Sequence, residues 1–242
     1  MNVEELAEKL ASWIREKVLA GGRQGTVLGM SGGVDSSVAA LLCQRAFPQH
    51  TVGVIMPCHS SPEDEQQAMA VATKFSVPTK TVIRDSAFDA LLKVLPDTNT
   101  TLAASRLAKA NLKVRLRMLT LYYFANQLDH IVVGASNRSE LAVGYFTKYG
   151  DGGVDIMPMG NLVKKQVMEL ARFLGIPQEI IDKPPSAGLW PGQTDEGDLG
   201  LSYAELDRYL ITGEAPGDVR KKIESMMAAS SHKRLTPLVP EF

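Results

Sequence analysis

The stretch Gly29-Met30-Ser31-Gly32-Gly33-Val34-Asp35-Ser36-Ser37 carries the residue types that most clearly indicate chemistry in this sequence. An apolar run with strand propensity comes just before it, and a run with helical character follows. Glycines let a backbone approach an anion, hydroxyls donate hydrogen bonds, and a helix N-terminus offers unpaired N–H groups at the positive end of its dipole. Asp35 inside this turn is a candidate Mg²⁺ ligand for a bound polyphosphate. The stretch therefore predicts a phosphate-binding loop.

This loop does not fit the familiar glycine motifs. A Walker loop needs Gly-x-x-x-x-Gly-Lys followed by Ser or Thr, and the stretch has no lysine. The dinucleotide fingerprint Gly-x-Gly-x-x-Gly is absent as well. An ordinary glycine-rich turn between a strand and a helix is the alternative to a ligand-binding role.

Three further charged residues stand where a strand ends or a helix begins. Glu140 falls one helical turn after a predicted strand, where it would reach the same metal ion as Asp35. The alternative is a solvated glutamate favoured by the helix dipole. Lys164 and Lys165 open a predicted helix, where a positive charge opposes the dipole, so a phosphate partner would explain them. A solvated lysine pair is the alternative.

The segment Gly144 to Asp155 is poor material for a protein core. It contains four glycines, two aspartates, a lysine and three aromatic residues, a composition typical of a binding loop on a rigid scaffold. Arg115 and Arg117 belong to a long predicted helix and point to different faces of it, so we expect at most one of them to face a ligand. The basic stretch 231–234 is compatible with a disordered tail.

Strands that alternate with helices would position these residues. The predicted strands span residues 26–30, 51–56, 79–83 and 131–134. The predicted helices span residues 3–19, 36–47, 62–75, 86–95, 102–128, 137–143, 162–174, 202–210 and 216–229, with loops at 144–160 and 183–200 and a polar tail from residue 230. The alternation predicts an α/β fold, a Rossmann-like parallel sheet with helices on both faces. The absence of repeats and linkers predicts a single domain over residues 1–242.

Ligands of such sheets bind at the carboxyl ends of the strands, close to the point where the strand order reverses. The phosphate loop follows the first predicted strand. Met56-Pro57 follows the second, and Ala135-Ser136 follows the fourth. These three segments are therefore expected to converge on one crevice.

Composition limits the classes of function. The chain has 242 residues, 45% hydrophobic and 22% charged, with a formal net charge of −1, which does not favour a sequence-independent nucleic-acid binder. Cys43 and Cys58 have no neighbouring Cys or His that would complete a zinc site, and two free thiols indicate a reducing compartment. No apolar run reaches 18 residues, and the N-terminus is charged and amphipathic, unlike a signal peptide. We expect a cytoplasmic protein with no membrane or nucleic-acid partner.

Several separated segments match one family. Ser31-Gly32-Gly33-Val34-Asp35-Ser36 resembles the pyrophosphate loop of the ATP-pyrophosphatase group, whose members cut ATP between its α- and β-phosphates. Together with Asn111–Arg117, Gly144–Gly152, Pro185–Trp190, Gly192–Glu196 and His232-Lys233, it makes the chain resemble the ammonia-dependent NAD⁺ synthetase family. The loop alone indicates the superfamily, and the segments 144–152 and 185–196 point to this family.

The resemblance implies a two-step reaction and a set of site residues. ATP adenylylates the nicotinate carboxylate of deamido-NAD⁺, and ammonia then displaces AMP to give NAD⁺. The implied ATP-binding residues are Gly29, Met30, Ser31, Gly32, Gly33, Val34, Asp35, Ser36, Ala135, Lys164 and Ser186. The implied deamido-NAD⁺-binding residues are Arg115, Lys148, Asp155, His232 and Lys233. Asp35 and Glu140 are implied to hold Mg²⁺, and Asp151 and Lys164 to take part in catalysis.

One residue departs from the family pattern. The family often has Thr after Gly134, whereas this chain has Ala135, so an ATP contact there would come from the backbone or from Ser136. The synthetase pattern runs from residue 31 to 233 and leaves no room for a glutaminase domain, so free ammonia is the expected nitrogen source. The resemblance also implies a homodimer, for which the helices at 3–19 and 102–128 are candidate interfaces, unless they serve only to cover the sheet.

Two alternatives stay open from the sequence. One is another enzyme with a pyrophosphate loop, such as a tRNA-modifying enzyme or a GMP-synthetase-like ligase, although the basic surface or sulfur-transfer cysteines expected of the former are not evident. The other is a non-catalytic nucleotide sensor, which would be expected to have lost Asp35, Glu140 or Lys164.

Overall fold

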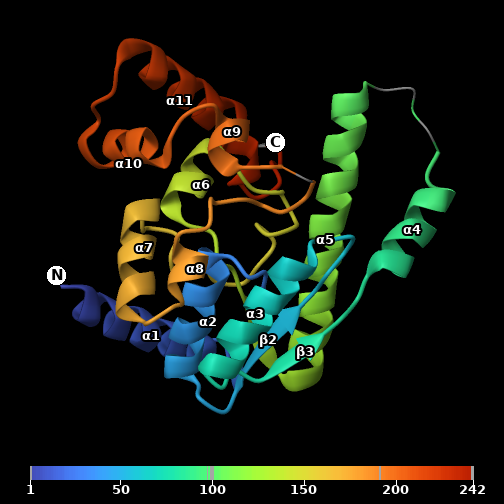
Figure 1. Cartoon of the computed structure of the whole chain (residues 1–242), viewed down its shortest axis with the longest axis vertical. Coiled ribbons are helices and arrows are strands. Elements are labelled where there is room, and N and C mark those ends of the chain that lie inside the picture. The colour runs from blue at the N-terminus through green and yellow to red at the C-terminus, as the bar shows by residue number, and fades with distance from the viewer. Residues whose placement is uncertain (1, 97, 99–100, 191, 241–242) are drawn as a thin grey trace.

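A four-stranded parallel sheet lies at the centre of the computed structural model, which describes residues 2–96, 98, 101–190 and 192–240 (Figure 1). The strand order is β3-β2-β1-β4, with bounds β1 Gly25–Met30, β2 Thr51–Ile55, β3 Thr79–Thr81 and β4 His130–Val133. Met30 pairs with Ile55 and Leu28 with Val133, so the carboxyl ends of the strands share one edge. The order reverses beside β1, which carries the phosphate loop. The predicted α/β class and parallel sheet are confirmed.

One face of the sheet is covered by a thick helical layer. It contains α1 (Val3–Ala20), α2 (Val34–Ala46), α3 (Pro62–Lys74), α7 (Lys164–Phe173) and α8 (Gln178–Ile181). Leu28 and Ile55 of the strands pack into this layer. Helix α2 lies inside it and is buried along almost its whole length. Burial on all sides explains why its sequence is apolar without the stripe of a surface helix.

The opposite face is covered mainly by α5 (Leu102–Leu128). Its Leu121 and Ala125 pack on Val27, Val54 and Val132 of the sheet. The Thr101 side chain accepts from the Ala104 N–H at the start of α5, and Asp129 ends the helix in the left-handed conformation. These two caps fix the bounds that the sequence predicted for this helix.

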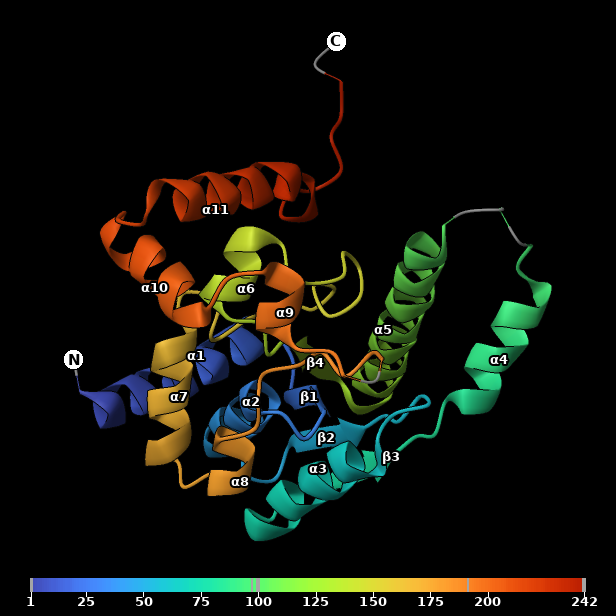
Figure 2. The same ribbon diagram turned by 45° about the horizontal axis from the view of Figure 1, so that its top comes forward.

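The remaining helices gather beyond the carboxyl ends of the strands (Figure 2). They are α6 (Arg138–Val143), α9 (Asp195–Leu199), α10 (Tyr203–Thr212), α11 (Gly217–Ala229) and the 3₁₀ helix η1 (Ser231–Lys233). Val143, Leu199, Leu206 and Ile223 form their own small core. Helix α4 (Asp85–Val94) stands apart from them, beside α5 (Figure 1).

Some predicted elements differ from the observed ones. Strands β2 and β3 end at Ile55 and Thr81, before the predicted ends at 56 and 83. Helices α8 and α9 and the turn η1 were not expected, because segments of three to five residues are too short to show a helical period. The tail is held at its start, since Lys233 Nζ donates to the carbonyl oxygens of Gly144 and Phe146 at 2.7 and 2.8 Å. In the part of the chain that the structure describes, no helix has the length and apolar character needed to span a bilayer.

Candidate active site

The phosphate loop joins β1 to α2 in a compact backbone turn. Gly32 has a φ of +82°, and a Cβ at this position would lie 2.4 Å from the carbonyl oxygen of Asp64. Only glycine fits such a conformation and such a close approach. The Ser31 and Ser36 hydroxyls lie 3.0 Å apart, and the Ser36 hydroxyl donates to the Gly33 carbonyl at 3.0 Å. The loop therefore holds its own hydroxyls in place, as a preformed anion cradle requires.

Asp35, in the first turn of α2, is bound by side chains from two other segments. Its Oδ2 forms an ion pair with Lys164 Nζ, and its Oδ1 accepts from Asn137 Nδ2 at 2.9 Å. The side chains of Lys164 and Asp35 are 5% and 20% exposed, so this ion pair is largely desolvated. Burial acts to lower the pKa of Lys164, but the charges of Asp35 and Glu140 outweigh burial and raise it. The lysine therefore stays charged beside the loop.

Glu140 is hydrogen-bonded to Asn137, the same residue that donates to Asp35. The Asn137 Oδ1 accepts from the Glu140 N–H at 3.1 Å, and Glu140 Oε2 accepts from the Asn137 N–H at 3.2 Å, a complete capping box at the start of α6. Burial, and then the neighbouring charge of Asp35, raise the pKa of Glu140. A buried carboxylate whose ionisation is disfavoured by a neighbouring negative charge makes a place where a cation is stabilised.

The donor set fits Mg²⁺ of the kind that also binds phosphates. Among residues 2–96, 98, 101–190 and 192–240, no group of three or more His, Cys, Asp or Glu side chains is arranged to hold a metal ion. Mg²⁺ in nucleotide sites commonly takes one or two carboxylates, with phosphate oxygens and waters as the other ligands. The carboxylates of Asp35 and Glu140 match that requirement.

Tyr203 and Asp195 are part of this site, and the sequence did not single them out. The Tyr203 hydroxyl donates to Asp195 Oδ2 at 2.9 Å and lies 3.5 Å from Glu140 Oε1, while Lys164 Nζ lies 5.2 Å from the centre of the Tyr203 ring. Asp195 Oδ1 is buried and finds no hydrogen-bond partner within the described chain. Asp195 stands in a stretch that carries the family resemblance, which was an available signal. Tyr203 had none, because only the fold brings it to Glu140.

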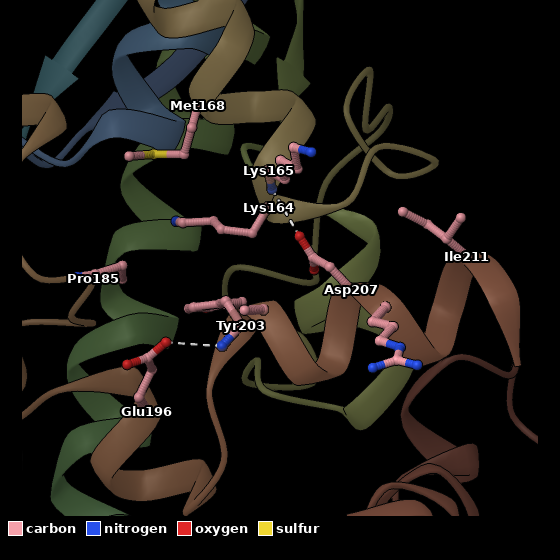
Figure 3. A pocket seen from close by; sticks show the side chains of 10 residues that line it. Lys164, Lys165, Met168, Pro185, Glu196, Tyr203, Asp207 and Ile211 are labelled. Carbon is pink, nitrogen blue, oxygen red and sulfur yellow. Dashed lines mark hydrogen bonds between the residues drawn. The ribbon is translucent and has the colours of Figure 1, made fainter. Parts of the chain in front are cut away.

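A cavity of about 540 Å³ lies beside Lys164, between α7 and α10 (Figure 3). Lys164, Glu196, Tyr203 and Asp207 are among the side chains that line it. Asp207 is fixed there, because it accepts from the Lys165 N–H at 2.8 Å and from the Ser139 hydroxyl at 2.5 Å. This volume is within the range of ordinary ligand pockets.

Four of the five residues implied to bind deamido-NAD⁺ lie together. Arg115 donates from Nε and Nη2 to the Lys148 carbonyl at 3.3 and 3.2 Å, and Lys148 Nζ donates to the His232 carbonyl at 2.5 Å. Lys233 follows His232 in η1, and its Nζ donates to the Gly144 carbonyl, which links η1 to the loop that begins there. Arg115 is exposed and Arg117 is half-buried, as expected for residues on different faces of a helix.

Asp155 lies away from this group. Its Oδ2 accepts from the Val132 N–H at 2.7 Å at the edge of β4, and its Oδ1 accepts from the Tyr122 hydroxyl at 2.9 Å. Tyr122 and Arg115 both belong to α5, about two helical turns apart and on nearly the same face. An elongated ligand along α5 would therefore pass both places.

The remaining candidate residues have local roles in this structure. Asp151 Oδ1 accepts from the Thr147 N–H at 2.7 Å and closes the loop in which it lies. Ser186 is exposed, and its hydroxyl accepts from the Gly188 N–H at 3.1 Å. Ala135 is half-buried, two residues after the end of β4 and next to the buried Ser136.

The structure combines a parallel α/β sheet with a glycine- and serine-rich phosphate loop, and a lysine and two carboxylates gather at the start of the helix that follows the loop. This combination defines the class of nucleotide-dependent enzymes that act on phosphate groups. Comparison with known proteins narrows the class. The family model for NAD synthase matches residues 6–237. The chain belongs to the NAD synthase family.

Individual relatives agree with this placement. The NH₃-dependent NAD⁺ synthetase of Carboxydothermus hydrogenoformans is 48% identical over 240 residues, covering 99% of this chain and 98% of the relative. A solved NMN synthetase from Francisella tularensis has a TM-score of 0.93 at 36% identity, with 100% of both chains covered. A solved NH₃-dependent NAD synthetase from Campylobacter jejuni has a TM-score of 0.81 at 30% identity, also with 100% of both chains covered. The predicted family of C–N-forming ligases is confirmed, and it is favoured over a tRNA-modifying or GMP-synthetase-like enzyme.

Proposed function

We propose that this protein uses ATP and ammonia to amidate the nicotinate carboxylate of deamido-NAD⁺, giving NAD⁺, AMP and pyrophosphate. The observation that carries the proposal is the gathering of Asp35, Lys164 and Glu140 at the phosphate loop of a chain in the NAD synthase family. A carboxylate is a poor electrophile, and its adenylate has AMP as a good leaving group. The protein's task is then positioning and charge stabilisation.

The first step would take place at the phosphate loop. Residues 29–36 and Lys164 would bind the triphosphate, with Ala135 contributing through its backbone and Ser186 through its hydroxyl. Asp35 and Glu140 would hold Mg²⁺, which neutralises charge on the departing pyrophosphate when bound. Lys164 is already buried and charged, so it needs no reorganisation to stabilise the same charge.

The second substrate would lie along α5 and the loop 144–155. Arg115, Lys148, His232 and Lys233 would bind one part of deamido-NAD⁺, and Asp155 another part further along α5. Asp151 would help to deprotonate ammonium. Its hydrogen bond to the Thr147 N–H uses one carboxylate oxygen and leaves the other for this role.

A second candidate substrate has a specific observation in its favour. The NMN synthetase from F. tularensis has a TM-score of 0.93 to this chain. The same chemistry on the corresponding mononucleotide would amidate nicotinate mononucleotide to NMN. The two substrates share the reacting carboxylate and differ in the AMP half.

The assembly and location belong to the same proposal. We propose one synthetase domain over residues 1–242 that acts as a homodimer with free ammonia, in the cytoplasm, where the buried unpaired Cys43 and Cys58 would stay reduced. Helix α1 buries Ala7, Ala11, Ile14 and Val18 within the protein itself. Helix α5 instead exposes Leu119 and Tyr123, each at 59%, one turn apart. Helix α5 is therefore the better candidate for the dimer interface.

The test is a reconstituted reaction. Purified protein is mixed with ATP, Mg²⁺ and either deamido-NAD⁺ or nicotinate mononucleotide, with ammonium or glutamine as the nitrogen source. We expect NAD⁺ from deamido-NAD⁺ and ammonium, detected with a coupled dehydrogenase, and none with glutamine. Faster amidation of the mononucleotide would favour the second candidate, and no pyrophosphate with either substrate would contradict both.

A further inference from the structure

Arg84 is a buried cation that the reaction as described does not use. It stands after β3, immediately before α4, and its residue exposure is 4%. Its Nη2 donates to the Met56 carbonyl at the end of β2, and its backbone N–H donates to the Pro57 carbonyl at 3.0 Å. Its Nε and Nη1 are buried without a hydrogen-bond partner in the described residues. Unsatisfied buried donors on a charged group are costly, so their retention indicates a missing partner.

Further positive charge surrounds Arg84. Burial, and then the charge of Arg117 on α5, lower the pKa of Arg84 to about 10. Burial likewise lowers the pKa of Arg117, and no hydrogen bond or ion pair from its side chain occurs among the described residues. Lys113 lies one turn earlier on α5, with Nζ 5.4 Å from the centre of the Phe88 ring of α4. Arg84, at the N-terminus of α4, and the cations of α5 therefore lie close to one another.

The acids near these arginines are already bound to other groups. Asp85 accepts from the His59 N–H at 2.7 Å. Asp151 accepts from the Thr147 N–H at 2.7 Å. Asp64 forms an ion pair with Lys183 at 2.8 Å. None of the three carboxylates accepts from Nε or Nη1 of Arg84, which remain without a partner among the described residues.

The position of the arginines relates them to the active site. Met56, Pro57 and Arg84 follow β2 and β3 on the edge of the sheet that also carries the phosphate loop after β1. Because Arg84 Nη2 donates to the Met56 carbonyl, the guanidinium lies at the end of β2, the strand next to β1, which corresponds to about 5 Å across the sheet. The charge of Asp151, the residue proposed to deprotonate ammonium, acts on Arg117. Arg84 therefore lies at the edge of the sheet where the crevice is expected, beside the phosphate loop and not within it.

We propose that Arg84 and Arg117 form an anion subsite that binds an oxyanion of the nicotinate-containing nucleotide, distinct from the loop that binds ATP. The inference rests on the proposed function, which supplies a second substrate with phosphate groups and a carboxylate. The phosphate loop follows β1, whereas the free donors of Arg84 belong to a guanidinium at the end of the neighbouring strand β2. Two arginines with unused donors match phosphate or carboxylate oxygens, which both accept charge-assisted hydrogen bonds.

The test compares ligand affinities of four proteins by calorimetry. They are the wild type, Arg84→Met, Arg117→Met and the control Arg172→Met, which changes an exposed arginine on α7. The ligands are deamido-NAD⁺, NAD⁺ and a non-hydrolysable ATP analogue. We expect Arg84→Met and Arg117→Met to bind deamido-NAD⁺ about 10- to 100-fold more weakly while binding the ATP analogue as the wild type does. The control should bind both ligands normally.

The affinity for NAD⁺ shows which oxyanion of deamido-NAD⁺ binds at the subsite, because NAD⁺ has the same phosphates but an amide in place of the carboxylate. An equal loss for NAD⁺ and deamido-NAD⁺ assigns the subsite to a phosphate, and a loss for deamido-NAD⁺ alone assigns it to the carboxylate. Unchanged deamido-NAD⁺ affinity in both variants, or weakening of the ATP analogue instead, would overturn the subsite.

Thermal unfolding without ligand separates a binding role from a structural one. Methionine removes an unsatisfied buried charge, so Arg84→Met should unfold at the same or a higher temperature than the wild type. If the wild type does not bind deamido-NAD⁺, the proposed function fails, and inorganic phosphate added with the ATP analogue in place tests the subsite separately. Phosphate binding that is lost in Arg84→Met would support the subsite, and phosphate binding that persists would overturn it.

Discussion

Asp35 and Lys164 lie 129 positions apart in the sequence and form a largely desolvated ion pair. A lysine with a side chain only 5% exposed depends on its partners for its charge. The pair therefore links the geometry of the phosphate loop to the start of α7. A change in either residue is expected to affect both folding and the chemistry at the loop.

Replacing Lys164 by methionine tests this link. We expect Lys164→Met to lower the rate of pyrophosphate release at least about 100-fold, since a fixed positive charge is lost where negative charge develops. The free energy of unfolding should fall by about 1–3 kcal/mol, because Asp35 loses its ionic partner but keeps Asn137 and some contact with water. Pyrophosphate release and urea unfolding measure the two effects. As a control, Lys165→Met removes an exposed lysine from the same helical turn and should change neither pyrophosphate release nor unfolding. Near-wild-type pyrophosphate release in Lys164→Met would contradict the proposed role of this lysine.

His130 gives a prediction for the pH dependence of stability. Its Nδ1 is buried without a partner in the described chain, and burial, with a smaller contribution from the charge of His50, lowers its pKa. The unfolded chain then binds a proton at a higher pH than the folded one, so stability should fall as the pH drops below about 6.5. We expect a shallower decline in His130→Gln when urea unfolding is measured between pH 7.5 and 5.5. Identical declines in the two proteins would exclude His130 as the cause.

The site could be predicted from the sequence where a short motif carries the information. Asp35, Glu140 and Lys164 were chosen from a loop, a strand end and a helix start, and the structure brings these three side chains together. Asn137, Tyr203 and Asp195 were not chosen, since their contacts depend on helices α6, α9 and α10 packing over the loop. No periodicity in the sequence encodes that packing.

The long helix α5 shows what local signals can predict. Its observed bounds, Leu102–Leu128, are those expected from the sequence, because a capping threonine and a left-handed aspartate mark its ends. Helix α9 spans five residues, Asp195–Leu199, and depends on the Thr194 cap and on packing of Leu199 in the small core. Elements of that length take their stability from tertiary contacts, so a sequence pattern does not reveal them.

Two glycines at helix C-termini allow a matched test of element packing. Gly144 after α6 has a φ of +72°, and a Cβ there would lie 2.1 Å from the Ser230 Cβ. Gly213 after α10 has a φ of +74° with nothing within 4 Å. We expect Gly213→Ala to lower the free energy of unfolding by about 1 kcal/mol from backbone strain, and Gly144→Ala to lower it by several times as much. Equal losses in urea unfolding would show that the contact between α6 and the chain after α11 is easily displaced.

For the whole molecule, the outer surface of α5 tests the proposed dimer. Leu119 and Tyr123 are each 59% exposed on a helix whose inner side covers the sheet. A charge placed at the centre of an apolar interface costs several kcal/mol, so we expect Leu119→Asp to shift the protein from dimer to monomer in sedimentation experiments. Ile211→Asp changes an equally exposed apolar residue on α10 and should leave the dimer intact. A dimer that survives Leu119→Asp would place the interface elsewhere.

Glu140 has two tasks, because its carboxylate closes the capping box of α6 and also faces Asp35 as a candidate metal ligand. Glutamine can serve in a capping box but does not supply the charge that a metal ion needs. Selection for folding and selection for activity should therefore differ in whether they accept glutamine at position 140. A screen that rewards only folded, abundant protein would accept glutamine there, whereas growth that depends on the enzyme's product would remove it. If Glu140 binds the metal ion as we propose, the acidic residue at position 140 would record selection for chemistry at a place where folding alone would tolerate an amide.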